Sequence, residues 1–347
     1  MTATRRRLLT ASIGLAMPAV RSVRAAPKSI TFAAYGGLFQ DLYEPAIVQP
    51  FAWAHHDIGV LYYALPSVAQ TLALLRRQRD LPDIDVVLLD LAAARTATAE
   101  GLLEPVSTAA MPILSELAPD MVFPGVAGPA LFTEPLVLLF DAAHARPEPS
   151  WKALWNTTES RSIAIAAPPD NAGIAFAVVA ARLFGGGNET HALDAGITAI
   201  GELARKVVTW DPSPDVDRYI GEGNAKLGVG WNMAAQIWSD RLGGRLGVAF
   251  PAEGTLSRVI TVNLVKGSRQ PEAARQFMAW LLGADAQRTM VETMFLGPVN
   301  AKTKYVEGAL LRTANTPERV AHAMPVDWVS VGAMRQAIEH RWHKVAG

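Results

Sequence analysis

The chain has 347 residues, 32 basic and 32 acidic side chains and no cysteine. This balance excludes the strongly basic surface of nucleic-acid-binding proteins. The absence of cysteine excludes disulfides, thiol chemistry and zinc sites with cysteine ligands, so stability must come from the buried core.

The N-terminus has the features of an export signal. Arg5, Arg6 and Arg7 precede an apolar run at 8–20, and small residues follow up to Ala25. A charged n-region, a short apolar h-region and a small-residue exit are typical of a secretory signal peptide, and the paired arginines are typical of the Tat route. The apolar run is too short to span a bilayer. We expect cleavage after Ala25 and a periplasmic mature protein; the alternative is an uncleaved helix or membrane anchor.

The mature chain alternates predicted strands and helices. Its length of about 320 residues exceeds what one core usually organises, so two lobes are expected. The alternation predicts an α/β fold with mostly parallel sheets covered by helices. Strands are expected at 29–34, 58–63, 86–89, 131–141, 163–166 and 224–232, and helices at 67–78, 190–207, 215–222 and 331–345. Pro135 cannot occupy a central ladder position throughout, so 131–141 is predicted to cross between lobes, with Glu134 and Pro135 at the hinge.

The segment 250–287 contains the clearest succession of predicted elements. It begins with a Pro-Ala-Glu-Gly-Thr turn, continues through the β-branched residues 259–262 and a Lys-Gly turn, and enters a helix with Pro271 in its first turn. This order predicts a loop, a strand and a docking helix.

Several motifs occur in the order of a known family. They are Tyr-Gly-Gly at 35–37, Leu-Pro-Asp-Ile-Asp-Val-Val at 81–87, Gly-Leu-Leu-Glu-Pro at 101–105, Pro-Ser-Trp-Lys-Ala-Leu-Trp at 149–155 and the segment 250–287. Together they resemble the family 1 extracellular solute-binding proteins of ABC transporters, particularly the spermidine/putrescine-binding branch.

The resemblance implies a two-lobed periplasmic binding protein of type II with a two-crossing hinge. One lobe would comprise 28–134 plus 251–298, and the other 136–249 plus 300–347. It also implies capture of a small polar solute, delivery to an inner-membrane permease, and no cofactor, metal or catalytic residue. We expect a monomer.

The ligand is expected in the cleft between the lobes, at strand ends and helix starts. The predicted ligand-binding residues are Tyr35, Gly36, Gly37, Asp90, Glu134, Asp170, Asn171, Trp231, Asn232, Glu253, Thr255 and Arg258. Trp231 is expected to stack on the ligand. A carboxylate in a Gly-Thr turn often accepts local N–H groups, and we favour this structural role for Glu253.

The sequence allows two alternatives for the charge of the ligand. Polyamine binders carry Trp and Asp where this chain has Arg258 and Ile260, so these two positions depart from the polyamine pattern. If Arg258 reaches the cleft, it favours a ligand with an anionic group, including a zwitterion. In the alternative, Glu134, Asp170 and Asp90 form an acidic wall for a cation and Arg258 pairs with one of them.

Other function classes receive less support. The chain has no G-x-S-x-G elbow, no H-E-x-x-H motif and no phosphate-binding loop. A periplasmic enzyme would have to use Asp90, Glu134 or Glu253 as acid and base. A binding protein that serves a membrane sensor would have the same sequence features as one that serves transport.

Overall fold

The computed structural model describes residues 28–65, 67–144, 146–185 and 189–346. The predicted export signal therefore lies outside the described residues. The strands are β1 (Lys28–Tyr35), β2 (Ile58–Leu65), β3 (Val86–Asp90), β4 (Leu103–Glu104), β5 (Ala130–Asp141), β6 (Ile163–Ile165), β7 (Val207–Thr209), β8 (Leu227–Trp231), β9 (Leu246–Ala249) and β10 (Ser257–Val265).

The helices cover both faces of the sheet. They are α1 (Leu38–Tyr43), the π-helix η1 (Glu44–Val48), α2 (Gln49–Ala54), α3 (Val68–Arg77), α4 (Leu91–Ala99), the 3₁₀ turns η2 (Pro112–Glu116) and η3 (Pro119–Met121), α5 (Ala153–Asn156), α6 (Asn171–Phe184), α7 (Glu189–Glu202), α8 (Val216–Gly221), α9 (Asn232–Arg241), α10 (Pro271–Leu282), α11 (Ala284–Met294), α12 (Glu307–Leu310), α13 (Pro317–Ala321) and α14 (Trp328–Ala346).

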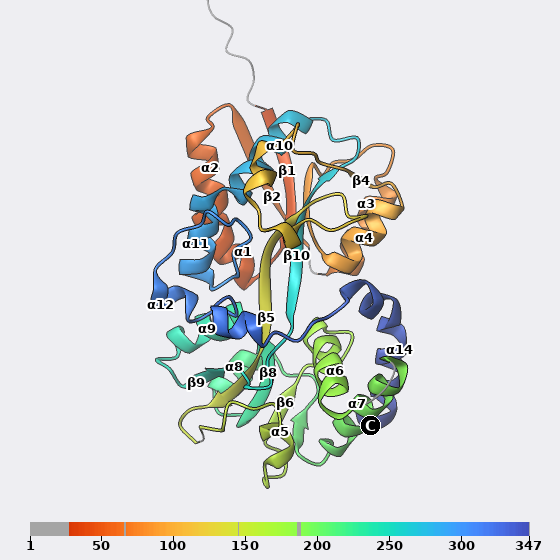
Figure 1. Ribbon diagram of the computed structural model, residues 1–347, viewed down its shortest axis with the longest axis vertical. Helices are drawn as coiled ribbons and strands as arrows, with labels where there is room; N and C mark the ends of the chain where they lie inside the picture. The colour runs from red at the N-terminus through yellow and green to blue at the C-terminus, as the bar shows by residue number, and fades with distance from the viewer. Residues whose placement is uncertain (1–27, 66, 145, 186–188, 347) are drawn as a thin grey trace, which may run out of the picture.

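The strands form one continuous ladder through two lobes, in the order β2-β1-β3-β10-β5-β8-β6-β7. The pairs β1–β2, β1–β3, β6–β7 and β6–β8 are parallel, whereas the pairs made by β5 and β10 are antiparallel. Figure 1 shows β1, β2 and α1 to α4 in the upper lobe, β6, β8 and α5 to α9 in the lower one, and β5 running between them. The predicted two-lobed α/β class is confirmed. The exact residue limits of the lobes stay a prediction.

Strand β5 changes partners at Pro135. Upstream it pairs with β10, and from Leu136 onward it pairs with β8. A proline, which has no N–H group, fits this exchange between two ladders better than it would fit the middle of one. The return connection passes through Gly254, which has a φ of +87°, and a Cβ there would collide with the carbonyl oxygen of His322. Glycine is therefore required in this turn.

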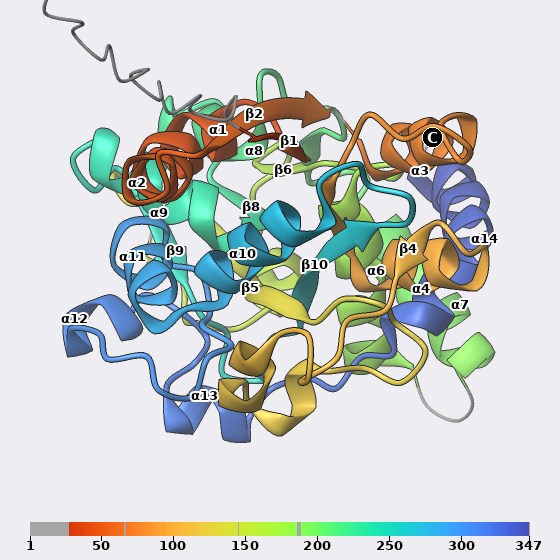
Figure 2. The ribbon, with the colours of Figure 1, turned by 90° about the horizontal axis from the view of Figure 1, so that it is seen from above.

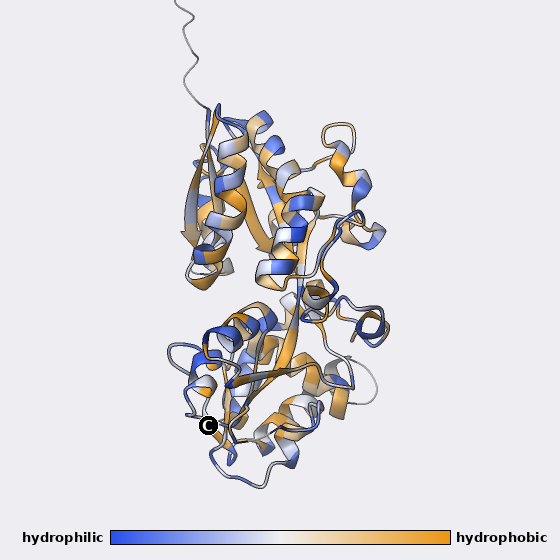
Figure 3. Cartoon of the chain, turned by 90° about the vertical axis from the view of Figure 1, so that its left-hand side faces the viewer, coloured by the Kyte–Doolittle hydropathy of each residue, from blue (hydrophilic) through white to orange (hydrophobic). Residues whose placement is uncertain are grey.

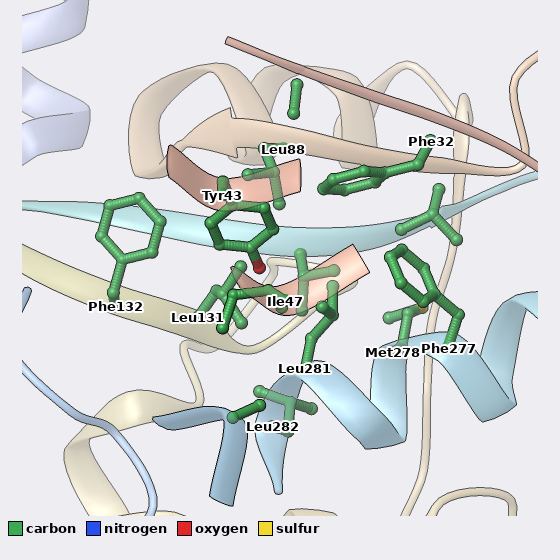
Figure 4. Packing of buried hydrophobic residues seen from close by; sticks show 14 of the residues in the cluster. Phe32, Tyr43, Ile47, Leu88, Leu131, Phe132, Phe277, Met278, Leu281 and Leu282 are labelled. Carbon is green, nitrogen blue, oxygen red and sulfur yellow. The ribbon is translucent and has the colours of Figure 1, made fainter. Parts of the chain in front are cut away.

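The core of the upper lobe contains several aromatic side chains. Phe32 on β1 meets Phe277 on α10 edge to face, with ring centroids 5.0 Å apart, and lies 6.0 Å from the Tyr43 ring. Figure 4 shows these rings packed with Leu281 and other aliphatic side chains between the sheet and α10. The view from above places α1 and α2 on one side of this lobe and α3 and α4 on the other (Figure 2). This part of 250–287 thus forms the predicted strand and docking helix.

The C-terminal helix α14 completes the core of the lower lobe. Ile338 and Trp342 are fully buried, and the Trp342 ring meets Trp210 at 5.4 Å and Phe176 at 6.5 Å. Figure 3 shows hydrophobic strands inside both lobes and more hydrophilic helices around them. The helix predicted at 331–345 is present and begins three residues earlier, at Trp328.

One predicted helix is wrong at its end. The helix expected at 190–207 stops at Glu202, and Val207 starts β7, which pairs with β6. The β-branched residues at 207–209 favour a strand, and the open edge of the sheet supplies its ladder partner.

Within the described ranges, no helix combines the length and the apolar character needed to cross a membrane.

Replacing Trp342 tests the contribution of α14. We expect Trp342→Ala to lower the free energy of unfolding by about 3–5 kcal/mol, because it leaves a large cavity among buried rings. Urea denaturation followed by circular dichroism measures the loss. Trp53, which is 67% exposed, provides the control. Trp53→Ala should change stability little, and an equal loss in both variants would contradict the role of α14.

Candidate ligand-binding site

The candidate site is a pocket between the two lobes, beside the crossing strands. It encloses about 500 Å³ of space, part of which is open solvent. Its walls come from the end of β3 and the start of α4, the start of α6, the end of β8, the first half of β10 and the first half of α14. The lining residues are Asp90, Leu91, Ala92, Asn171, Ile174, Trp231, Arg258, Val259, Ile260, Trp328, Val331, Gly332 and Arg335.

Arg258, which lines this pocket, forms an ion pair with Glu134. They are direct neighbours across the β5–β10 ladder, and the Nε and Nη2 atoms of Arg258 donate to Glu134 Oε2 at 2.9 and 2.5 Å. Glu134 Oε1 accepts the N–H of Met233 at 2.9 Å, and the Glu134 side chain is 1% exposed. The two strands and the start of α9 are thereby tied to one carboxylate. The predicted alternative in which Arg258 pairs with an acidic residue agrees with this geometry.

Aromatic rings cover the guanidinium of Arg258. Its Cζ atom lies 4.4 Å from the centroid of the Trp231 ring and 5.9 Å from that of Tyr35. These distances suit cation–π interactions. Trp231 thus contacts Arg258 and lines the pocket, whereas Tyr35 is not among the lining residues. Burial raises the pKa of the Tyr35 hydroxyl above its usual value, against the opposing effect of Arg258, so it stays protonated.

Two aspartates cap helices on facing lobes. Asp90 Oδ1 accepts the N–H of Ala93 at 2.8 Å at the start of α4, and Asp170 Oδ1 accepts the N–H of Ala172 at 2.6 Å at the start of α6. Burial raises the pKa of both carboxyl groups, while these N–H groups and the nearby arginines oppose the shift. Asp90 ends the parallel strand β3 and lines the pocket, whereas Asp170 lies in the loop between the parallel strand β6 and α6, outside the lining. The carboxyl ends of parallel strands are where α/β folds place their ligands.

Arg335 on α14 is a pocket residue that the sequence analysis missed. Its Nη1 donates to Asn171 Oδ1 at 2.7 Å, and its Nη2 donates to the carbonyl oxygen of Pro169. The same helix touches the upper lobe, because a Cβ on Gly332 would lie only 2.7 Å from that of Ala92 on α4. The spacing of apolar residues in the sequence identified the buried face of α14. It gave no information on which lobe the other residues of this helix contact.

The remaining predicted residues have structural partners or lie outside the lining. Glu253 accepts from Ser150 Oγ at 2.5 Å and from the N–H of Trp151 at 3.3 Å, and Thr255 donates to the carbonyl oxygen of Leu136. Asn232 donates to the carbonyl oxygens of Phe295 and Arg312. The lining also does not include Gly36 and Gly37, although Gly37 has a φ of +63° and stands at the N-cap of α1.

Asp217, in the first turn of α8, is a buried acid outside the pocket lining. It is 5% exposed, and its Oδ1 has no hydrogen-bond partner among the described residues. Burial and the neighbouring carboxylate of Asp215 raise its pKa well above the usual value, with smaller contributions from Glu134 and Asp170. No cluster of three or more possible metal ligands occurs in the part of the chain that the structure describes.

Comparisons with known proteins identify the family. Residues 46–307, more than half of the chain, match the model of the bacterial extracellular solute-binding proteins, so the chain belongs to that family. Among curated proteins, none matches. The spermidine/putrescine-binding branch stays a prediction.

Solved structures of similar fold cover 92% of this chain. An ABC transporter protein from Clostridium perfringens has 21% identity and a TM-score of 0.74, and all of that chain is covered. The binding protein MotA from A. tumefaciens B6, in complex with glucopine, has 19% identity and a TM-score of 0.75, again over its full length. AfuA from Actinobacillus pleuropneumoniae, with fructose-6-phosphate bound, has 18% identity and a TM-score of 0.73, with 99% covered. At these identities the likeness establishes the two-lobed fold.

Breaking the ion pair should be costly. We expect Glu134→Ala to lower the free energy of unfolding by about 3–5 kcal/mol, because it leaves the guanidinium of Arg258 without its buried partner. Denaturant titration measures this loss, and the double variant with Arg258→Met should recover part of it. Glu100→Ala, which removes an exposed pair with Arg76, is the control and should have a much smaller effect. Equal losses would argue against the buried pair.

Asp217→Asn should make stability less dependent on pH. Because the folded protein holds the pKa of Asp217 above its unfolded value, the wild type is favoured at low pH and loses stability as pH rises through the folded pKa. The asparagine carries no charge, so its stability advantage over wild type should be larger at about pH 8 than at about pH 5. Unfolding titrations at both pH values measure the difference, with the exposed Asp57→Asn as control. A constant difference would refute the prediction.

Proposed function

We propose that the protein captures a small charged solute in this pocket, outside the cytoplasmic membrane, and delivers it to the permease of an ABC importer. The observation that carries the proposal is that both lobes and a crossing strand contribute residues to the pocket lining. Asp90 comes from the upper lobe, Asn171 and Trp231 come from the lower lobe, and Arg258 lies on β10 where the chain crosses between them. A solute in contact with all of these walls stabilises the closed arrangement of the lobes.

We further propose that the solute carries an anionic group and is a zwitterion. Around the pocket, the charges of Arg258 and Arg335 face those of Asp90, Glu134 and Asp170. Because Glu134 pairs with Arg258, the guanidinium of Arg335 remains beside the helix-capping carboxylates of Asp90 and Asp170. Such a mixture suits a ligand with one anionic and one cationic end, the cationic end stacking on Trp231 or binding a carboxylate.

A polyamine is the alternative ligand. The carboxylates of Asp90 and Asp170 favour it, but the guanidinium of Arg335 would repel one end of a diamine. Among proteins of similar fold, MotA holds glucopine and AfuA holds fructose-6-phosphate, so this architecture accommodates ligands that are not polyamines. We propose that the mature protein acts as a monomer in the periplasm, as the predicted export signal implies.

Ligand screening and scattering together test the function. We expect a thermal-shift screen of amino acids, amino-phosphonates, sugar phosphates and polyamines to yield a ligand that stabilises the fold by about 2.7 kcal/mol at a hundredfold excess over its Kd. Small-angle scattering should then show a smaller radius of gyration with that ligand bound. Incubation with catalytic amounts of protein should leave the ligand chemically unchanged. Turnover of the ligand, or the absence of any binder among these classes, would overturn the proposal.

A further inference from the structure

We infer that Arg335, on the C-terminal helix α14, is the residue that binds the anionic group of the solute. The inference rests on the proposed function and deepens it, since it assigns the ligand's anionic end to one side chain. The ligand class that follows is an amino-carboxylate or amino-phosphate, whose anionic group meets Arg335. Its ammonium group then meets the acidic side of the pocket at Asp90.

The first step concerns Arg258, the arginine that the sequence singled out. Its Nε and one terminal nitrogen both point to Glu134 Oε2, and Trp231 covers its guanidinium at 4.4 Å. An anion approaching Arg258 would therefore compete with a carboxylate that is 1% exposed and cannot move away into solvent. Arg258 serves to hold the crossing strands and the Trp231 ring.

The second step concerns the charge of Arg335. Its two hydrogen-bond partners, the side-chain oxygen of Asn171 and the carbonyl oxygen of Pro169, are both neutral. In the described ranges, no carboxylate oxygen lies within 4.0 Å of its nitrogens. A guanidinium has five N–H donors, so two bonds leave donors for a ligand. Arg335 thus lines the pocket as a fixed cation without an ion-pair partner.

The third step concerns the position of Arg335 relative to Asp90. The pocket brings both side chains into one lining, and the positive charge of Arg335 favours the ionised form of Asp90, opposing the effect of burial on its pKa. Gly332, one turn before Arg335, lies against Ala92 at the start of α4, so α14 meets the upper lobe next to Asp90. A zwitterion held between Arg335 and Asp90 would therefore connect α14 to the upper lobe.

A purely structural role for Arg335 is the competing explanation. Its bonds to Asn171 and Pro169 tie α14 to the loop before α6, and their loss could weaken any ligand by loosening the pocket. The two roles differ in which ligands would bind more weakly to an Arg335 variant. Loss of an anion-binding residue weakens ligands according to their anionic group, whereas a loosened pocket weakens all ligands alike.

The test is titration calorimetry of wild type, Arg335→Gln and Arg335→Lys. The probes are glutamate, 4-aminobutanoate, 2-aminoethylphosphonate and fructose 6-phosphate, with 1-aminobutane and putrescine as probes without an anionic group. For the anionic probes that bind wild type, we expect Arg335→Gln to raise the Kd about 30-fold or more, as for a charge pair shielded from water. Arg335→Lys should retain part of the affinity, and amine-only probes should bind Arg335→Gln no more weakly than wild type.

Arg341→Gln is the matched control. Arg341 lies on the same helix and pairs with Asp194 at 2.9 Å, outside the pocket lining. It should bind every probe as wild type does. If Arg335→Gln does not fold, Arg335→Lys carries the comparison, because it keeps the charge and loses the planar fork.

Three outcomes would overturn the inference. They are unchanged affinity of Arg335→Gln for an anionic probe, an equal loss for anionic and amine-only probes, and binding of wild type to none of the anionic probes. If wild type binds putrescine alone, the proposed capture of a solute stands and the role of Arg335 falls. If it binds no probe here and no compound in the wider screen, the proposed function falls as well.

Discussion

The ion pair between Glu134 and Arg258 is the interaction on which the cleft depends. It forms because β5 and β10 run antiparallel and place these two residues opposite each other at the point where β5 leaves one lobe for the other. Removing two charges from water is costly, so such a pair rarely raises stability over an apolar one. Here the same carboxylate also receives the N–H of Met233 at the start of α9. The pair therefore fixes three segments relative to one another where the lobes meet.

The rest of the pocket follows from the topology of the sheet. In each lobe a parallel strand ends toward the cleft and a helix starts there, so Asp90 and Asp170 cap α4 and α6 from opposite sides. Each carboxylate satisfies an N–H group that would otherwise lack a partner at a helix start. The helix ends partly offset the acidic charge, and a mixed set of charges can thus coexist in one pocket.

The parts of the site that the sequence could predict are those set by local chain order. Asp90 and Trp231 are the last residues of β3 and β8, and Asn171 begins the helix that follows β6. Strand ends and helix starts can be read from hydrophobic runs and turn residues. Arg335 could not be found this way, since its position depends on how a helix far along the chain docks between two lobes. The short strand β7 was missed for a similar reason, because three residues become a strand only when β6 offers them a ladder. For Glu253 the sequence favoured a structural role with local N–H partners, whereas its partners, Ser150 and Trp151, lie about a hundred residues away in the chain.

Helix α14 lines the pocket and contacts both lobes. Its second half belongs to the lower lobe, since Ile338 and Trp342 are buried in that core. Its first half reaches the hinge and the upper lobe, where Trp328 Nε1 donates to the carbonyl oxygen of Ser257 at 2.8 Å and Gly332 contacts Ala92. A side chain larger than that of glycine would separate α14 from α4 at this contact. The wall that carries Arg335 is therefore complete only when α14 rests on α4. Under the proposed function, a ligand bound in the pocket would favour this contact between the lobes.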